Sequence, residues 1–355
     1  MIWLTWRQFR AAAAMTAGAL AVLAAVLAVT GPELAGDYSA GIAGCAANGD
    51  CGRFFDRFFD EHQTSFLAVT LVVLVLPALV GLFWGAPLIT RELESGTHLL
   101  VWNQSITRSR WLAVKLGLVG LAAVAAAGLC SLVVTWWSGP LDRSAAPGFG
   151  LMDPLVFGAR GVVPMGYAAF AFVLGVTVGM LVRRTLPAMA ITLAVFAALQ
   201  IAVPLLVRPH LLPPVSASFE LGRDNVDDFL VPGGGAGPGA HVMLAPAIPG
   251  RPGAWVLSGE LVDGSGRVLG DEGAGVLVPV SLTSGPCGTS AMREPGEGAM
   301  SACLAEVNRL GYRQRAVYQP FERFWPFQWI ETGLYALLAL GLTAFCFDRL
   351  RRRLS

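Results

Sequence analysis

The sequence predicts an all-α integral membrane protein that has six transmembrane helices and a small α+β extracellular lobe between the fifth and sixth. Of its 355 residues, 55% are hydrophobic and only 14% are charged, whereas an ordinary globular chain contains about 25% charged residues. Six runs of the chain contain no charged side chain, and a long polar segment separates the last two runs. Six such runs in one soluble protein are implausible.

These charge-free runs determine the predicted number of spans. They cover residues 11–30, 63–90, 116–141, 161–182, 185–207 and 332–347. A bilayer core of about 30 Å needs about 20 helical residues, and a segment inside lipid must pair its own backbone groups, which favours helices. The last run reaches this length only if residues 324–331 join the same helix. The first run is longer than the apolar core of a secretory signal peptide, so we expect an uncleaved span.

The cationic residues indicate which helix ends face the cytoplasm. If the N-terminus lies inside, the short inner segments hold twelve cationic residues and the two short outer loops hold four. Cytoplasmic loops carry the excess of lysine and arginine in membrane proteins. We therefore expect a multi-pass protein of the plasma membrane with both termini in the cytoplasm. The inner cationic residues are Arg7, Arg10, Arg91, Arg108, Arg110, Lys115, Arg183, Arg184, Arg349, Arg351, Arg352 and Arg353.

This topology divides the chain into five parts. An entry helix and the first span occupy residues 1–30, an extracellular loop 31–65, the second to fifth spans 66–207 with a cytoplasmic loop at 85–115, the extracellular lobe 208–323, and the sixth span with a basic cytoplasmic tail 324–355. Within the lobe, residues 255–262 and 267–268 flank an Asp-Gly-Ser-Gly sequence, which predicts a β-hairpin. Residues 299–310 are predicted to form a short helix.

Two cysteine pairs fall on the predicted outer side of the membrane. Cys45 and Cys51 lie together in the first outer loop, and Cys287 and Cys303 lie together in the lobe. An oxidising compartment favours two disulfides. Four free thiols are the alternative, and zinc suits these pairs less because neither has histidines at ligand spacing.

Residues 53–60 repeat the sequence Arg-Phe-Phe-Asp at a spacing of four. On a helix this spacing places the phenylalanines on one face and the charges on the other. The repeat predicts a helix that either lies on the outer leaflet or packs against the lobe.

Several chemistries are excluded by what the sequence lacks. The net charge of +1 provides no basic field for nucleic acid. A Walker A motif needs Gly-Lys-Ser/Thr after a glycine loop, but the only lysine, Lys115, lies between Val114 and Leu116. The four histidines form no metal-binding pattern, and no G-x-S-x-G nucleophile elbow occurs. We expect no catalytic residue, metal site or cofactor in this chain.

Glu331 is the only ionisable residue in the predicted spans once residues 324–331 are added to the sixth. Ionisable residues within a membrane often mark substrate or ion pathways, so Glu331 is a candidate pathway residue. Two alternatives are an ion pair with Arg323 or Arg160 and an ordinary position at the membrane interface.

The inner loop at 85–115 reads GAPLITRELESGTHLLVWNQSITRSRWLAVK. It predicts a short polar helix near residues 91–100, a break at 103–105, and a following helix capped by Ser105 or Thr107. Arginine and tryptophan at membrane boundaries are typical interface anchors. The predicted anchors are Trp3, Trp6, Arg7, Arg10, Arg108, Arg110 and Trp111.

This loop resembles the second inner loop of actinobacterial ABC-2-type transporter permeases. The pattern E-x-E-x-G-T followed by W-x-Q-S-x-T-R-x-R-W-x-x-x-K is carried by Glu92, Glu94, Gly96, Thr97, Trp102, Gln104, Ser105, Thr107, Arg108, Arg110, Trp111 and Lys115. Residues 318–331 match the same group, and residues 3–10 are similar to its amphipathic entry helix. The lobe departs from the pattern, because simpler members have short outer loops.

The resemblance implies an ABC-2-type permease fold and a membrane subunit of an ATP-driven exporter. In the family, the helix of this loop is a coupling helix that docks on a separate cytoplasmic ABC ATPase, which binds ATP and Mg²⁺. The membrane pathway would need a second permease copy, identical or paralogous, surrounded by membrane lipid. The coupling residues implied here are Arg91, Glu92, Glu94, Gly96, Thr97 and His98.

Other functions remain open on the sequence. An ABC-linked mechanotransmission or signalling protein could use the lobe to bind a partner, although that class usually has fewer spans and places its outer domain between the first and second. A secondary transporter often carries ionisable residues at mid-membrane, which the first five spans lack. A membrane enzyme would need a catalytic cluster that the sequence does not contain.

Overall fold

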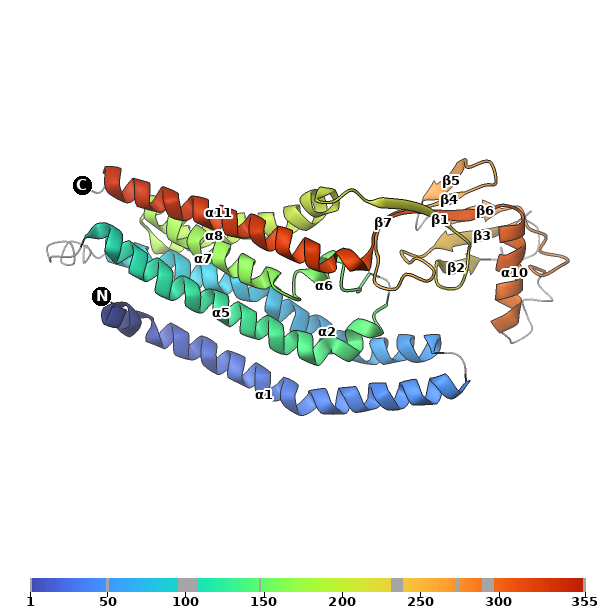
Figure 1. The fold of residues 1–355 in the computed structure, drawn as a ribbon, viewed down its shortest axis with the longest axis horizontal. Coiled ribbons are helices and arrows are strands. Elements are labelled where there is room, and N and C mark those ends of the chain that lie inside the picture. Colours follow the sequence, from blue (N-terminus) through green and yellow to red (C-terminus); the bar gives the residue numbers. More distant parts are fainter. Residues whose placement is uncertain are drawn as a thin grey trace. The chain divides into compact units, whose positions relative to one another are not determined.

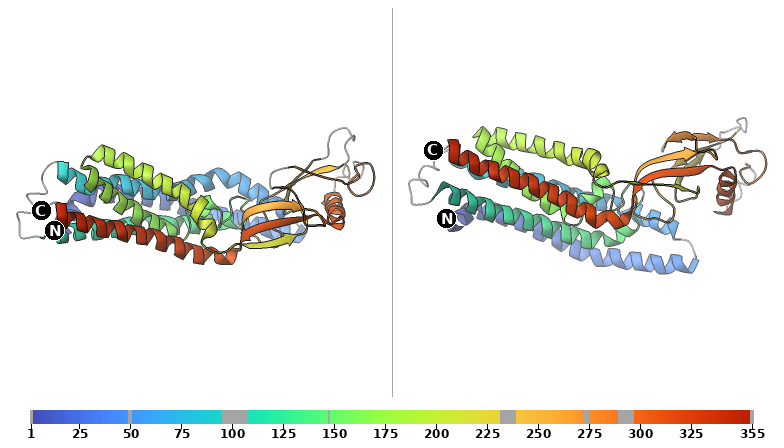
Figure 2. Two further views of the ribbon diagram at one scale, coloured as in Figure 1. Left: turned by 90° about the horizontal axis from the view of Figure 1, so that it is seen from above. Right: turned by 45° about the horizontal axis from the view of Figure 1, so that its top comes forward.

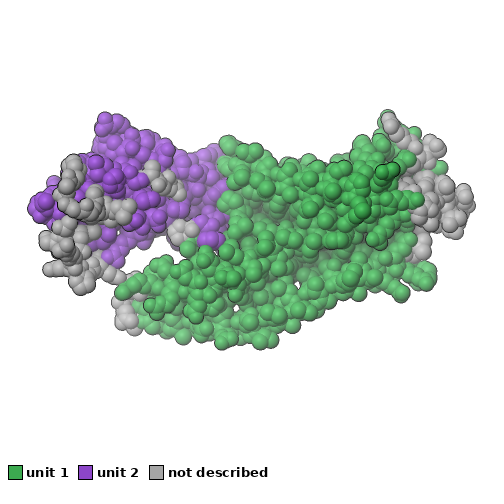
Figure 3. Space-filling view, turned by 180° about the vertical axis from the view of Figure 1, so that it is seen from behind, with its two compact units in different colours: residues 1–146, 154–211, 325–355 green, residues 147–153, 212–324 purple. Residues whose placement is uncertain are grey.

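The computed structural model describes residues 2–48, 51–94, 107–146, 148–230, 239–271, 275–288 and 297–353. The chain forms two compact units, which Figure 3 distinguishes by colour. Unit 1 comprises residues 1–146, 154–211 and 325–355, and unit 2 comprises residues 147–153 and 212–324.

Unit 1 is helical. Within the described part of the chain, six helical segments are long and apolar enough to cross a membrane, so the predicted number of spans is confirmed. The sixth helix begins at Phe324, which means that the short last run does join the residues before it. Both termini lie at the same end of the helices (Figures 1 and 2). The six main helices are α1 (Ile2–Asn48), α2 (Gly52–Val80), α5 (Arg108–Arg143), α7 (Val163–Val182), α8 (Thr185–Ala202) and α11 (Phe324–Arg353).

The predicted loop at 31–65 is almost entirely helical in the structure. α1 continues through Pro32 to Asn48, and α2 begins at Gly52. Tyr38 on α1 packs against Phe54 and Phe58 on α2, with ring centroids 6.1 and 5.6 Å apart. Both helices therefore continue beyond the charge-free runs. There they pack on each other through an apolar face and form an amphipathic hairpin. The phenylalanine repeat thus packs on α1, a partner that neither sequence-based alternative named.

A π-helical turn joins α2 to the short helix that follows it. α2 continues through η1 (Gly81–Gly85) into α3 (Ala86–Glu94). Pro77 lies one turn before η1 and has no backbone N–H to donate, which favours a local change in the helix. The predicted polar helix near 91–100 therefore starts earlier, and its second half lies outside the described residues.

Close backbone packing holds this turn against α7. A Cβ atom added to Gly85 would lie 2.4 Å from the carbonyl oxygen of Phe172, and one added to Gly175 would lie 2.4 Å from that of Gly81. Small residues of this kind allow helices in membranes to approach closely. α7 itself is buried on nearly every side, which its uniformly apolar sequence favours.

The predicted start of the helix that follows the inner loop is confirmed. Thr107 caps α5, because its Oγ1 atom accepts a hydrogen bond from the backbone N–H of Arg110 at 3.4 Å; Ser105, the other predicted cap, lies outside the described residues. The chain also contains α6 (Pro154–Phe157) before α7, and η2 (Val203–Val207) and η3 (Arg208–His210) after α8.

Unit 2 is built from two antiparallel sheets and one long helix, α10 (Glu297–Arg309). A shared apolar core includes Val242, Leu261, Val278, Leu304 and Val307. The first sheet has the order β1 (Val215–Phe219), β7 (Arg313–Gln319), β4 (Trp255–Val262) and β5 (Val268–Asp271), and the second has the order β2 (Val226–Leu230), β3 (Ala240–Leu244) and β6 (Val276–Val278). A short 3-10 helix, η4 (Phe321–Arg323), precedes α11.

The predicted β-hairpin at 255–268 is confirmed. Val262 pairs with Val268 at the end of the β4–β5 ladder. Asp263 closes the turn, because its Oδ1 atom accepts hydrogen bonds from the backbone N–H groups of Ser265 and Arg267 at 2.9 and 3.0 Å. An aspartate that binds its own turn in this way is a common turn-forming device. The predicted helix at 299–310 corresponds to α10.

Candidate functional site: the α3 helix and the buried ion pairs of unit 1

The α3 helix carries those predicted coupling residues that the structure describes. Arg91, Glu92 and Glu94 lie in its last turns, and Arg91 and Glu94 are exposed. Gly96, Thr97 and His98 lie outside the described residues.

Glu92 joins α3 to two other helices. The Nζ atom of Lys115 on α5 donates a hydrogen bond to Oε1 of Glu92 at 2.5 Å, and Nε2 of Gln8 on α1 donates to the same oxygen at 3.0 Å. The side chain of Lys115 is only 3% exposed, and its ammonium group lies 4.9 Å from the centre of the Trp111 ring. Glu92 is therefore the centre of a contact between α1, α3 and α5, and the only lysine of the chain is its partner on α5.

Glu94 joins α3 to the start of α8. Its Oε1 atom accepts a hydrogen bond from the backbone N–H of Thr185 at 2.8 Å, and its Oε2 atom accepts one from the Thr185 hydroxyl at 2.7 Å. The first N–H groups of a helix have no partner within the helix, so this carboxylate caps α8 from a neighbouring element.

The two hydrogen bonds from Thr185 lower the pKa of the Glu94 carboxyl from its ordinary value of 4.5, and the nearby Arg184 and Arg91 act in the same direction. The contact with α8 therefore contributes to stability above pH 4.5 and is lost as the pH falls through the lowered pKa.

α3 is thus bonded to three long helices and packed against a fourth. Because Glu92 holds α1 and α5, Glu94 holds α8, and η1 packs on α7, a displacement of α3 would be passed to most of unit 1. Both glutamates are engaged within the unit itself. The sequence singled out these glutamates and placed Lys115 in the same motif, but it predicted none of their contacts with Gln8, Lys115 and Thr185.

The predicted interface anchors fall into two groups. Trp3 and Trp6 are exposed, at 67% and 52%, and the guanidinium group of Arg7 lies 5.4 Å from the Trp3 ring. Trp111 is buried, with 2% exposure, because its ring packs inside unit 1 beneath Lys115. It therefore does not face lipid as an interface anchor would. Of the remaining anchors, Arg7, Arg10 and Arg110 are exposed and Arg108 is half-buried.

Glu331 is fully buried and paired, but with a different arginine from those predicted. Nε and Nη2 of Arg208 donate to its two carboxylate oxygens at 2.7 and 3.0 Å. The hydroxyl of Tyr167 donates to Oε1 of Glu331 at 2.5 Å, and the Arg208 guanidinium group lies 4.1 Å from the Phe157 ring. Arg323 donates elsewhere, to the Pro213 carbonyl and the Gln319 side chain.

A second buried pair lies at the ends of α5 and α6. Arg160 donates through Nε and Nη2 to the carboxylate of Asp142, both at 3.2 Å, and the Ser138 hydroxyl donates to Oδ2 of Asp142 at 2.8 Å. The sequence did not predict that Arg208 and Asp142 are buried and paired. Each directly follows a charge-free run, and a charged residue at that position normally indicates the exposed end of a span.

Gln328 on α11 binds the backbone of the segment that joins α6 to α7. Its Oε1 atom accepts hydrogen bonds from the backbone N–H groups of Val162 and Val163 at 3.0 and 3.1 Å, and its Nε2 atom donates to the carbonyl of Phe157 at 3.2 Å. The segment around α6 is therefore bonded to α11 through Gln328, and the ring of Phe157 also packs against Arg208, the partner of Glu331 on α11.

The two predicted cysteine pairs are both present as disulfides. Cys45 and Cys51, with Cα atoms 5.0 Å apart, close the tip of the α1–α2 hairpin. Cys287 and Cys303, with Cα atoms 4.6 Å apart, tie α10 to the segment before it. Among the described residues, no group of three or more His, Cys, Asp or Glu is placed to hold a metal ion.

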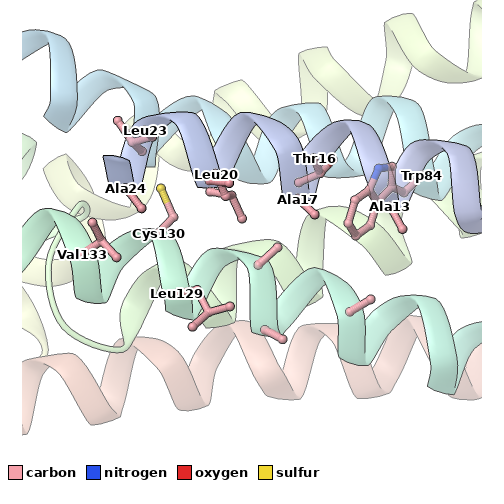
Figure 4. Close-up of a pocket in the computed structure, with 14 residues that line it drawn as sticks. Ala13, Thr16, Ala17, Leu20, Leu23, Ala24, Trp84, Leu129, Cys130 and Val133 are labelled. Atoms are coloured by element: carbon pink, nitrogen blue, oxygen red, sulfur yellow. The ribbon is translucent and has the colours of Figure 1, made fainter. Parts of the chain in front are cut away.

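α1 has pockets on two sides. A pocket of about 490 Å³ separates it from α5, and Figure 4 shows Leu20 and Cys130 lining it from the two helices. A second pocket of about 960 Å³ lies between α1 and α2 and is lined mainly by apolar side chains. Leu20 and Trp84 line both pockets.

Comparison with known proteins agrees with this architecture. The model of the family described as ABC-2 membrane transporter related matches residues 17–208, which is more than half of the chain. The matched part runs from α1 to η3 and contains α3 with its partners Lys115 and Thr185. Searches of curated proteins and of solved structures found no match. The chain therefore belongs to the ABC-2 membrane transporter related family.

Proposed function

We propose that this chain is the membrane-spanning permease subunit of an ATP-binding cassette exporter, which forms the substrate pathway and is driven by a separate cytoplasmic ATPase. Family membership and six membrane-length helices support a multi-pass permease. The observation that carries the coupling role is the position of α3, a short helix bonded through Glu92 and Glu94 to α1, α5 and α8.

The proposed mechanism transmits movement through α3. ATP and Mg²⁺ bind in the partner, whose closure displaces α3, and the long helices follow because their bonds to Glu92 and Glu94 move with it. Such a change is an equilibrium between two arrangements that nucleotide binding in the partner biases. This chain supplies no catalytic group and hydrolyses no nucleotide.

The proposed docking surface is the end of α3 together with the residues that follow it. Arg91 is exposed there, and Gly96, Thr97 and His98 continue the same segment. Glu92 and Glu94 act as internal links rather than as the surface that a partner touches first.

The proposed orientation places both termini and α3 in the cytoplasm and unit 2 outside the cell, in the plasma membrane. The distribution of arginine supports this, and two disulfides suit an oxidising compartment. A second permease copy, either identical or a paralogue, completes the pathway within membrane lipid.

The internal links can be tested in a complex with a co-expressed ABC ATPase. We expect Glu92→Gln or Lys115→Gln to leave the ATPase bound to the permease but to lower its ATP turnover in the complex several-fold, because α3 then moves without α5. The exchange variant E92K/K115E restores the opposite charges in reversed order, and we expect it to recover most of the turnover.

Two results would contradict this function. If no ABC ATPase co-purifies with the wild-type chain, the role as a permease subunit is wrong. If both single variants and the exchange variant show wild-type turnover, α3 does not couple through these links. An exposed pair at the end of α11, Arg352 with Asp348 at 2.7 Å, provides the control, since Asp348→Asn should change neither binding nor turnover.

One observation favours a second candidate, the signalling role. Unit 2 has an apolar core and a disulfide of its own, which is more structure than a connection between two helices requires. A chain in which a short linker replaces the lobe distinguishes the two roles. An exporter retains stimulated ATP turnover in that variant, whereas a protein that signals through the lobe loses its response to an extracellular partner.

A further inference from the structure

Two adjoining hollows form a long groove between α1 and α2. The first, of about 960 Å³, extends from Gln8 to Val26 on α1 and is lined on the other side by residues from Ala68 to Arg91. The second, of about 700 Å³, is lined by residues between Val26 and Asp37 on α1 and between Phe54 and Val69 on α2. Val26 and Ala68 line both hollows, so we treat them as one α1–α2 groove.

The groove changes character along its length. Apart from Gln8 and Arg91 at one end, the residues that line the first hollow belong to the charge-free runs 11–30 and 63–90, and most of their side chains are apolar, among them Met15, Leu23 and Leu76. The second hollow lies where both helices leave these runs. One part of its lining is apolar, including Leu27 and Val69, and the remainder is polar or charged.

The charged part of the second hollow is predominantly acidic. Glu33 and Asp37 on α1 and Glu61 on α2 line it together with one cationic residue, Arg57. Across the part of the chain that the structure describes, no hydrogen bond or ion pair joins these three carboxylates to another residue. They are therefore available to a ligand, and the lining carries a net negative charge at neutral pH.

Aromatic rings stand beside these carboxylates. Phe54, Phe58 and Trp137 line the same hollow, and the ring centroids of Phe54 and Phe58 lie 5.6 Å apart. Aromatic faces attract organic cations, and quaternary ammonium groups are recognised by rings of this kind. Rings and carboxylates together form a lining suited to a cationic head group, while the adjoining apolar hollow suits a hydrocarbon tail.

We propose that the α1–α2 groove binds a cationic amphiphile, with its positive head group at Glu33, Asp37 and Glu61 and its apolar tail along the first hollow. The assignment of this molecule as the exported substrate rests on the proposed permease function. The proposal that it binds in the α1–α2 groove does not depend on that function. A phospholipid fits less well, because its phosphate would lie among three carboxylates and a single arginine. Each hollow also lies within the range of about 300–1,000 Å³ typical of ligand pockets.

Binding can be measured on the full chain alone in phosphatidylcholine nanodiscs, with radiolabelled dodecyltrimethylammonium as the probe. We expect saturable binding that dodecyl sulfate, an anion with the same tail, does not displace. The variant E33Q/E61Q should bind about fivefold more weakly, since two favourable charges are removed from a partly exposed site. Arg57→Gln should bind more tightly than the wild type, because it removes the only arginine of the second hollow, where the head group lies.

A matched control is available on the same helix. Asp56 and Asp60 on α2 are exposed and do not line the groove, so D56N/D60N makes the same change in net charge and should bind like the wild type. The proposal is overturned if the probe does not bind saturably, if dodecyl sulfate binds the same site more tightly, or if E33Q/E61Q and D56N/D60N behave alike. Because no ATPase is present, failure here leaves the permease function standing, and loss of ATPase binding leaves this site standing.

Discussion

Arg208 and Glu331 are both fully buried, and each provides the counter-charge that the other needs in an apolar surrounding. A buried pair of this kind is weak evidence for net stabilisation, because both ions have lost their hydration. Removal of one partner alone is costly, since the remaining charge stays buried without compensation. A substitution at one of these two positions therefore needs a compensating substitution at the other.

This constraint gives a prediction for single and double variants. We expect Glu331→Gln or Arg208→Met to reduce the free energy of unfolding by roughly 3–5 kcal/mol, whereas R208L/E331L should recover much of that loss. The measurement is thermal and denaturant unfolding of the chain in nanodiscs. The half-exposed pair of Arg315 and Glu260 serves as the comparison, because Glu260→Gln should cost about 1 kcal/mol or less. Equal losses for Glu331→Gln and Glu260→Gln would show that burial does not determine the cost.

At the scale of elements, the backbone of α7 closely approaches the backbone of η1 and of the start of α3. An added Cβ at Gly179 would lie 2.8 Å from the carbonyl oxygen of Ala86, and one at Gly175 would lie 2.7 Å from the backbone nitrogen of the same residue. Glycine at these positions is required by the distance between two backbones. Gly175 and Gly179 therefore permit close packing, whereas a Cβ added to Gly117 on α5 would meet nothing within 4 Å.

This difference between glycines predicts opposite outcomes for the same substitution. Gly175→Ala must push α7 away from η1 and should lower both the melting temperature and the ATPase turnover of the complex. Gly117→Ala adds a methyl group in open space, and alanine is a better helix former by about 1 kcal/mol, so its stability should be unchanged or slightly higher. Melting curves of both variants in nanodiscs provide the measurement. A stable, active Gly175→Ala chain would mean that this packing is looser than the structure indicates.

Three prolines of the long helical segments also differ in what they do. Pro77 precedes η1 and Pro204 lies within η2, so both accompany π-helical turns. Pro187 lies in the first turn of α8, where a backbone N–H would have no partner within the helix. It therefore favours the start of a helix rather than a kink.

For the whole molecule, the proposed orientation predicts a pattern of chemical labelling in intact cells. Arg267 is exposed in the β4–β5 turn of unit 2, and Arg351 is exposed at the end of α11. We expect a membrane-impermeant maleimide to label Arg267→Cys in intact cells and Arg351→Cys only after lysis. The background should be low, because Cys130 and Cys346 are buried and the other four cysteines form disulfides. Labelling of Arg351→Cys in intact cells would reverse the assigned topology.

The sequence by itself determined the features that depend on local pattern. Bilayer-length runs without charge specify six spans because lipid imposes helices of that length. The Asp-Gly-Ser-Gly turn and the cysteine pairs, six and sixteen residues apart, join positions that are close along the chain. The inner-loop motif was also sufficient to indicate the family.

Only the tertiary structure decided which charged groups meet. Glu331 and Arg208 are 123 residues apart, and Glu94 and Thr185 are 91 residues apart. Such partners depend on how each helix is rotated about its axis and how deeply it lies in the membrane. The sequence of a span specifies neither when most of its faces are equally apolar. The same holds for the α1–α2 groove, which exists only through the space left between two helices.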